Sequence, residues 1–282
     1  MEFRKVKQCH PPHRDDVGDL VTWRPLPGPA LPRLGPFLFL NHHGPQVYPP
    51  NNRGLPFGPH PHRGFETVSF ILAGSLAHAD SAGHESVIDA GGVQWMTAGR
   101  GIVHSELSPA AFRRDGGPLE ALQLWINLPA ALKMSPPRYT GLQAADIPTL
   151  AAADGKAEIA LIAGSRDGVT GPIASLTGIF MSVVTLAAGG EVRFEGLAGR
   201  SVFLYVVRGA IAIGGTTVPG FHLAELGDAG DAVAITASAD SVLLFGHGAP
   251  LDEPVVSYGP FVMNTRAEIE QAIADYQAGR FA

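Results

Sequence analysis

Short apolar segments recur along the whole chain, and glycine, proline, asparagine or aspartate bounds each of them. They run about 5 to 8 residues and are rich in Val, Ile, Phe and Thr, which is typical of strands. With 35 glycines and 24 prolines to form turns, the chain is predicted to be an all-β sandwich or barrel. The segments include FLFLNHHG, ETVSFILAG, GGVQWMTAG, ALQLWINLP, AEIALIAG, FMSVVTLAAGG, SVFLYVVRGAIAIGG and AVAITA.

One helix is predicted, in the segment NTRAEIEQAIADYQAGRF close to residue 282. Thr265 can cap its first turn while Glu268 reaches back, which is the pattern of a capping box. Ile269 and Ile273 then repeat at helical spacing, and Gly279 can end the helix.

A weak internal repeat suggests that the chain holds two similar β domains. SFILAGSLAHADSAG resembles YVVRGAIAIGG and pairs Gly74 with Gly209, an offset of 135 residues. AGGVQWMTAG resembles AGDAVAITAS and pairs Gly91 with Gly230, an offset of 139. We therefore expect one domain over residues 1–138 and a second over 139–282 that ends in the helix, joined in the loop-like stretch 129–148.

Two short motifs predict a metal site. GPHPHRGFET carries His60 and His62 at positions i and i+2, and GRGIVHSELSP carries His104 and Glu106 at the same spacing. Residues i and i+2 share one face of a strand, so two such strands can direct four ligands at one ion. Three imidazoles and a carboxylate suit Fe, Mn, Co, Ni, Cu or Zn, with positions left for water or substrate.

Other polar residues near these motifs have more than one interpretation. Glu66 follows His62 at even spacing and is a fifth ligand, a partner of a ligand, or a structural acid. His42 and His43 in LNHHGP either line the same site or, as we favour, are ordinary loop residues. Three further histidines have no partner at useful spacing and are expected to be solvated: His10, His78 and His84.

Composition excludes several classes of protein. A net charge of −6 gives no electrostatic reason to bind nucleic acid directly. The single cysteine, Cys9, excludes an internal disulfide and suits a reducing compartment. No signal-like leader and no apolar stretch of about 20 residues is present. We therefore expect a cytoplasmic protein with no membrane segment.

The quoted segments resemble those of a known family. GPHPHRGFETVSFILAG and GGVQWMTAGRGIVHSE are similar to two signature segments of pirin-like proteins, a branch of the cupin superfamily. GPFLFLNHHGP and EPVVSYGPFVMNTRAEIEQAIADYQAGRF resemble further segments of the family, so the resemblance covers nearly the whole chain. It implies two cupin (jelly-roll) β-barrels in tandem, followed by the short helix.

The resemblance also implies one divalent transition metal in the N-terminal barrel. The family's ligands fall on His60, His62, His104 and Glu106, and the usual metal is Fe(II), with Ni, Cu, Mn, Co and Zn left open. Cupins in general take a glutamate nearer the first pair, which is Glu66 here by spacing. Pirin-like proteins take the other glutamate, so Glu106 is expected to be the ligand.

The second barrel is predicted to lack a metal. Adding the two repeat offsets to the four ligand positions leads to apolar residues at three places and one acid. Those positions are Glu195, Leu197, Leu243 and Phe245, and His222 and His247 nearby lack the paired spacing.

Family resemblance implies a quercetin 2,3-dioxygenase, which opens the flavonol ring with O₂ and releases carbon monoxide. Glu106 is then the candidate catalytic base. Phe57, Phe65, Met96 and Trp95 are candidates to line a pocket for the flat substrate, although each also suits an ordinary barrel core.

The alternative is a non-enzymatic, metal- or redox-responsive regulatory protein that binds a transcription factor or a metabolic enzyme. Activity on another small phenolic substrate is also open, because cupins support many chemistries. The resemblance favours a monomer.

Overall fold

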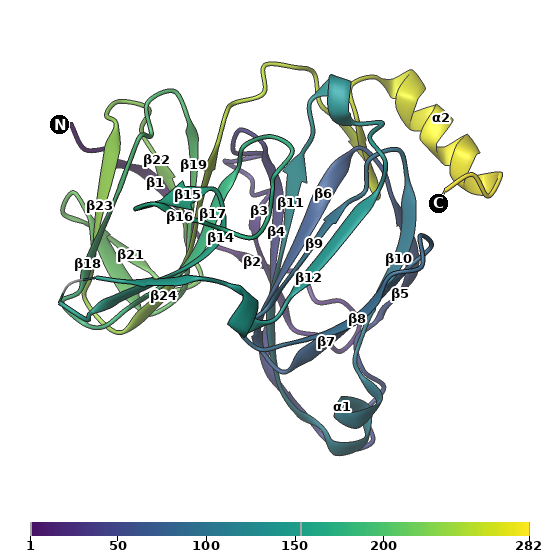
Figure 1. Cartoon of the computed structure of the whole chain (residues 1–282), viewed down its shortest axis with the longest axis horizontal. Coiled ribbons are helices and arrows are strands. Elements are labelled where there is room, and N and C mark those ends of the chain that lie inside the picture. Colours follow the sequence, from purple (N-terminus) through teal and green to yellow (C-terminus); the bar gives the residue numbers. More distant parts are fainter. Residues whose placement is uncertain (1, 153, 282) are drawn as a thin grey trace. The chain divides into compact units, whose positions relative to one another are not determined.

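The computed structural model describes residues 2–152 and 154–281, and its contacts divide the chain into two compact units (Figure 1). The N-terminal barrel comprises residues 14–23, 38–145 and 251–282. The C-terminal barrel comprises residues 1–13, 24–37 and 146–250. The expected division at residue 138 treated each half as continuous, whereas both ends of the chain join the barrel of the other half.

The N-terminal barrel is built from two antiparallel sheets. The first has seven strands and the second has four, and a hairpin of β25 (Val256–Tyr258) and β26 (Phe261–Met263) adds to them. In spatial order the first sheet is β12 (Arg138–Leu142), β9 (Val93–Thr97), β6 (Phe65–Ala73), β11 (Gly117–Asn127), β4 (Phe37–Tyr48), β3 (Thr22–Leu26) and β2 (His13–Arg14). The second is β5 (Phe57–His62), β10 (Ile102–Leu107), β7 (Ser75–Asp80) and β8 (Glu85–Asp89).

The C-terminal barrel repeats the same arrangement of seven strands and four. Its seven-stranded sheet is β1 (Val6–His10), β22 (Leu223–Leu226), β19 (Ser201–Arg208), β24 (Ser241–Gly248), β17 (Phe180–Leu186), β14 (Ala157–Ala163) and β13 (Thr149–Ala151). Its four-stranded sheet is β18 (Glu191–Glu195), β23 (Ala232–Ala237), β20 (Ala210–Ile213) and β21 (Thr216–Pro219), and β15 (Ser165–Arg166) pairs with β16 (Val169–Thr170). The prediction of two all-β cupin barrels is thus confirmed.

Only one of the two repeat matches has the same role in both barrels. Gly74 and Gly209 each link two strands with a positive φ, of 80° and 84°. Gly91 precedes β9 in a seven-stranded sheet, whereas Gly230 precedes β23 in a four-stranded sheet. The match of Gly91 with Gly230 therefore aligns strands that are not equivalent in the two barrels. Short strands along the chain share one apolar pattern, and their hydrogen-bonded neighbours are needed to distinguish them.

Pairing order makes β18 and β23 the counterparts of β5 and β10. The inward residues of these two strands are Val192, Phe194, Val233 and Ile235, all buried in the core of the C-terminal barrel. Leu243 and Phe245 instead lie on β24, the counterpart of β11. The four apolar side chains at the places that correspond to the triad offer no ligand atoms, and the absence of a metal from the second barrel stays a prediction.

The C-terminal helix α2 (Arg266–Gln277) belongs to the N-terminal barrel, not to the second half as expected. Thr265 and Glu268 form the predicted capping box, and Gly279 follows with a φ of 67°. Ile269 and Ala272 pack on Phe261 and Met263 of β26, which holds the helix on this unit. The remaining helical turns are α1 (Ala110–Asp115), η1 (Ala130–Leu132) and η2 (Ala144–Asp146). Neither α-helix of the described chain is long and apolar enough to cross a membrane.

Candidate metal centre

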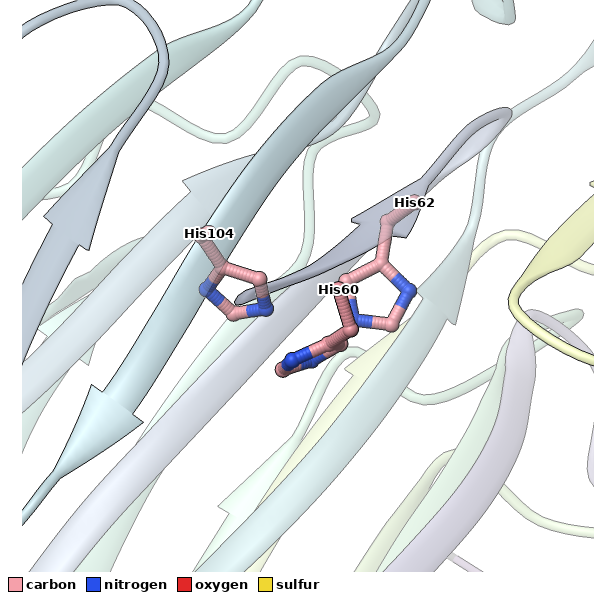
Figure 2. Close-up of side chains that lie close together, drawn as sticks. All are labelled: His60, His62 and His104. Carbon is pink, nitrogen blue, oxygen red and sulfur yellow. The ribbon is translucent and has the colours of Figure 1, made fainter. Parts of the chain in front are cut away.

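Neighbouring strands β5 and β10 bring three histidines together inside the N-terminal barrel. The two strands are antiparallel, with His104 opposite His60 and Ile102 opposite His62. Directly opposed residues share a face of the sheet, as do residues two apart on one strand. Figure 2 shows the result, in which the imidazoles of His60, His62 and His104 point toward one another.

The three rings lie in contact. Their centroids are 4.8 Å apart for His60 and His62, 4.4 Å for His60 and His104, and 4.9 Å for His62 and His104. One nitrogen from each ring lies within 4.8 Å of the others. His62 and His104 are buried, while His60 is partly exposed, so the cluster has one side open to solvent.

Hydrogen bonds to backbone carbonyls fix the orientation of two of the rings. Nδ1 of His60 lies 2.7 Å from the Gly58 oxygen, and Nδ1 of His62 lies 3.4 Å from the Pro260 oxygen. A carbonyl only accepts, so each Nδ1 carries a proton, and Nε2 is the nitrogen that remains available to a metal. This is how histidine ligands of metals are commonly held.

His104 has no hydrogen-bond partner on either ring nitrogen, although both are buried. Burial lowers the pKa of His104 and His62 well below the usual value, and neighbouring imidazoles lower it further. Both rings are therefore neutral at pH 7, the form that binds metals. An unpartnered buried imidazole is costly, and a cation at the centre of the cluster would satisfy it. The residues present thus fit a metal ion.

Glu106 does not join the group of three nitrogens. Its carboxylate accepts hydrogen bonds from Oγ of Ser69 at 2.7 Å and from Nε2 of Gln123 at 2.6 Å. The pairing of β10 with β5 is irregular here, because three steps along β5, from His60 to Phe57, oppose two steps along β10, from His104 to Glu106. Glu106 still faces the barrel interior beside Phe57, but its role as a ligand stays a prediction.

Glu66 is buried and lies outside the group of three nitrogens, and its role stays a prediction. Arg63 and Gly64 separate β5 from β6, so the even spacing from His62 does not carry through to Glu66. Its carboxylate accepts from Oγ1 of Thr97 at 2.6 Å, and burial raises its pKa. The opposite face of β6 carries Ser69, which is the face directed at Glu106.

His42 and His43 lie on β4, not in a loop, and both are buried. Nε2 of His42 lies 3.0 Å from Oε1 of Glu120, and Nδ1 of His43 lies 2.9 Å from Oγ1 of Thr22. The expectation of a loop was wrong, because β4 runs through both histidines from Phe37 to Tyr48. Neither histidine belongs to the cluster of three.

Two of the three histidines expected to be solvated are buried. His78 stacks on Tyr139 with centroids 3.9 Å apart, and its Nε2 lies 3.1 Å from Asp80. His10 pairs with Glu225 at 2.8 Å. Glu225 is 215 residues from His10, so the local pattern could not reveal that pair. Asp80 is two residues from His78 on β7, and the i, i+2 spacing of a strand was the signal that could have revealed it. His84 is exposed, as expected.

The candidate pocket residues divide into two groups. The Phe65 ring lies 5.1 Å from that of His62, and Phe57 borders a cavity of about 20 Å³ beside Glu106. Met96 packs in the core with Ala98 and Ile102, and its role in a pocket stays a prediction.

Sequence reasoning missed Trp125. Its ring centroid lies 5.4 Å from that of His62 and 4.4 Å from that of Phe65, to which it is tilted by 37°, and its buried Nε1 has no partner. The signal was the alternation in ALQLWINLP, which places Trp125 on the same face of β11 as Gln123.

A chain of two jelly-roll barrels, one of which holds three converging imidazoles, is a bicupin. The Pirin family matches residues 13–126, and the Pirin C-terminal cupin domain matches residues 181–282. The chain belongs to the pirin family.

Relatives in this family span most of the chain. A Pseudomonas aeruginosa protein, provisionally named a quercetin 2,3-dioxygenase, is 42% identical over 248 residues, which are 88% of this chain and 87% of that protein. The Pirin-like protein of Solanum lycopersicum is 42% identical over 265 residues, 92% of this chain and 86% of that one. The crystal structure of quercetin 2,3-dioxygenase from Acinetobacter baumannii has a TM-score of 0.93 at 34% identity, covering 100% and 99% of the two chains.

Proposed function

We propose that the chain is a metal-dependent dioxygenase that cleaves quercetin or a related flavonol with O₂ and releases carbon monoxide. The observation that carries the proposal is the triad of converging imidazoles, in which buried His104 has no hydrogen-bond partner. The names of the Pseudomonas and Acinetobacter relatives support the substrate class. His60, His62 and His104 would hold the metal, and Fe(II) is the metal we propose.

A divalent metal bound there supplies Lewis acidity toward the 3-hydroxyl and 4-carbonyl oxygens of a flavonol, together with a site for O₂ chemistry. The protein contributes the fixed Nε2 lone pairs and a water-poor interior. The Nδ1 bonds of His60 and His62 keep both rings oriented before substrate arrives, so little reorganisation is needed.

Glu106 is the proposed base for the flavonol 3-hydroxyl proton. Ser69 and Gln123 donate one hydrogen bond each, which leaves further lone pairs on both carboxylate oxygens. These two donors hold the carboxylate on the interior face of the barrel, next to the strand position of His104. The same group would then return the proton as the ring-opened product leaves.

Substrate is proposed to enter on the side of His60. The cavity beside Glu106 and Phe57 measures about 20 Å³, which holds little more than a water molecule. Sites for small organic ligands are typically about 300–1,000 Å³. His60 is the partly exposed member of the triad, and the rings of Phe65 and Trp125 pack edge-to-face with that of His62.

The first test is metal content and quercetin turnover of the His62→Ala variant after reconstitution with Fe(II). We expect most bound iron to be lost with an unchanged far-UV spectrum, because one of three ligands is removed. His13→Ala, which removes an exposed imidazole, is the matched control and should bind iron as the parent does. Full iron occupancy in His62→Ala would refute the ligand assignment.

The second test separates chemistry from metal binding. Glu106→Gln should retain iron but lose turnover by about 100-fold or more, the usual contribution of a general base. Loss of flavonol absorbance with carbon monoxide release measures turnover. A parent protein that is fully loaded with iron and inactive on quercetin would refute the enzymatic proposal and leave the regulatory alternative.

A further inference from the structure

A cavity of about 770 Å³ opens in the C-terminal barrel, entirely within residues 164–247. Strands β15, β17, β18 and β24 and the segment 173–179 form its walls. Its volume is in the range of sites for small organic ligands. Nothing described above assigns it a role, since the inward side chains of β18 and β23 below it are apolar.

One cation on the wall of this cavity has no anionic partner. Nε of Arg200 donates to Nδ1 of His247 at 2.5 Å, and Nη2 donates to the Gly178 oxygen at 2.7 Å. Among the described residues no carboxylate pairs with Arg200. The other two arginines of the lining do have partners, because Arg166 lies 3.2 Å from Asp167 and Arg193 lies 2.6 Å from Glu191.

His247 adds a neutral donor beside Arg200. Burial, with a further contribution from Arg200, lowers the pKa of His247 to about 4, so the ring is uncharged at pH 7. Its Nδ1 accepts the bond from Arg200, so the proton resides on Nε2. Nε2 has no described hydrogen-bond partner and can donate to a ligand. A guanidinium and an imidazole N–H side by side suit a carboxylate.

Two aromatic side chains, Phe180 and Phe194, also line the cavity among its polar residues. The ring of Phe180 is parallel to that of His247, at a centroid distance of 4.9 Å and an angle of 1°. Phe194 presents its face to Arg166, whose guanidinium carbon lies 4.8 Å from the ring centroid. Aromatic side chains of this kind pack against planar rings, which an inorganic anion lacks.

We propose that this cavity is a second ligand site, which binds a small aromatic carboxylate with its charged group on Arg200 and His247 and its ring against Phe180. Glu195 also lines the cavity, is exposed and has no described partner. Its negative charge opposes the ligand, so its removal strengthens binding.

The test is calorimetric titration of the iron-loaded full chain with 2-naphthoate, a planar carboxylate without a catechol group. We expect a Kd of about 1 mM or below, from the usual affinity per atom of small ligands. Arg200→Gln should weaken binding at least about 10-fold, because a charge-assisted contact is lost. Arg33→Gln removes an exposed arginine of the same barrel outside the cavity and should leave the Kd unchanged.

Glu195→Gln removes a negative charge near the ligand's carboxylate and should tighten binding about 2- to 5-fold. A misfolded variant cannot bind more tightly, so this result separates an effect on the site from a loss of folding. The uncharged analogue 2-naphthamide should bind more weakly than 2-naphthoate. The absence of binding at about 5 mM 2-naphthoate, which is 5-fold above the expected limit, would overturn the proposal. So would binding that Arg200→Gln leaves intact, or binding that His62→Ala abolishes, since the latter places the ligand at the metal centre.

Discussion

Gly64 and Gly83 offer a matched pair for testing how the backbone beside the metal centre is held. Both lie in the N-terminal barrel, and both have a φ of 90°. A Cβ at Gly83 meets nothing within 4 Å, whereas a Cβ at Gly64 would lie 2.0 Å from the oxygen of Val262. Alanine at either position pays a similar conformational cost of about 1–3 kcal/mol. The difference in unfolding free energy between the two variants therefore measures the cost of the contact between the new Cβ and the Val262 oxygen.

The extra cost at Gly64 follows from the contacts that must move. The Val262 oxygen must retreat by about 1 Å or more to reach a tolerable separation. Nζ of Lys133 bonds both the Gly64 oxygen, at 2.8 Å, and the Val262 oxygen, at 3.0 Å. A buried donor that loses a partner costs about 1–3 kcal/mol. Gly64→Ala should therefore destabilise by about 3 kcal/mol more than Gly83→Ala.

Urea unfolding followed by tryptophan fluorescence measures this difference. The chain has three tryptophans, Trp23, Trp95 and Trp125, and all lie in the N-terminal barrel. The signal therefore reports on the unit that carries both glycines. A difference between the two alanine variants of less than about 1 kcal/mol would refute the reasoning, because only the shared strain would remain.

Two further predictions concern the same region. Lys133→Met leaves the oxygens of Gly64, Val262 and Asn127 without their ammonium donor, and should cost about 3 kcal/mol in the same urea assay. Arg100→Met is the control at an exposed position and should change the unfolding free energy by less than about 0.5 kcal/mol. Equal losses of stability in Lys133→Met and Arg100→Met would contradict the prediction. Bonds from Arg63, Gln271 and Arg280 lower the pKa of Asp275 to about 2. A carboxyl group whose pKa is lowered by folding stabilises the folded state at pH values above its unfolded pKa, near 4. That stabilisation is lost as the pH falls toward 2. The difference in unfolding free energy between the parent and Asp275→Asn should therefore shrink between pH 5 and pH 2.

The sequence predicted the strands because their signal is local. Each apolar run between turn residues became a strand, including those over 65–73, 117–127 and 201–208. The i, i+2 spacing of His60 and His62 on one strand, and the position of His104 on its neighbour, also sufficed to predict the triad. Both inferences need only strand periodicity, which a chain of short strands displays along its length.

Features that depend on pairing were not predictable in the same way. The even spacing of His62 and Glu66 would place both side chains on one face if a single strand held them. Arg63 and Gly64 instead separate β5 from β6, so the spacing does not predict the face on which Glu66 lies. The pairing of β10 with β5 also holds an extra residue on β5, between Phe57 and His60, which no count of residues along β10 could reveal. A single unpaired residue reverses which face a side chain occupies, and sequence spacing cannot register it.

The exchange of terminal segments between the barrels bears directly on the metal centre. The carbonyl that orients His62 belongs to Pro260, 198 residues further along the chain. Val262 on the same hairpin accepts from Lys133 and bonds Arg63, the residue after His62. Asp275 of α2 then pairs with Arg63 at 2.8 Å. Residues 1–138 contain all the proposed ligands. They lack the Pro260 carbonyl that fixes the tautomer of His62, and they lack the Val262 and Asp275 groups that bind Arg63 at the end of β5. The first half of the chain therefore supplies the ligands, and the last 32 residues, 251–282, supply their support.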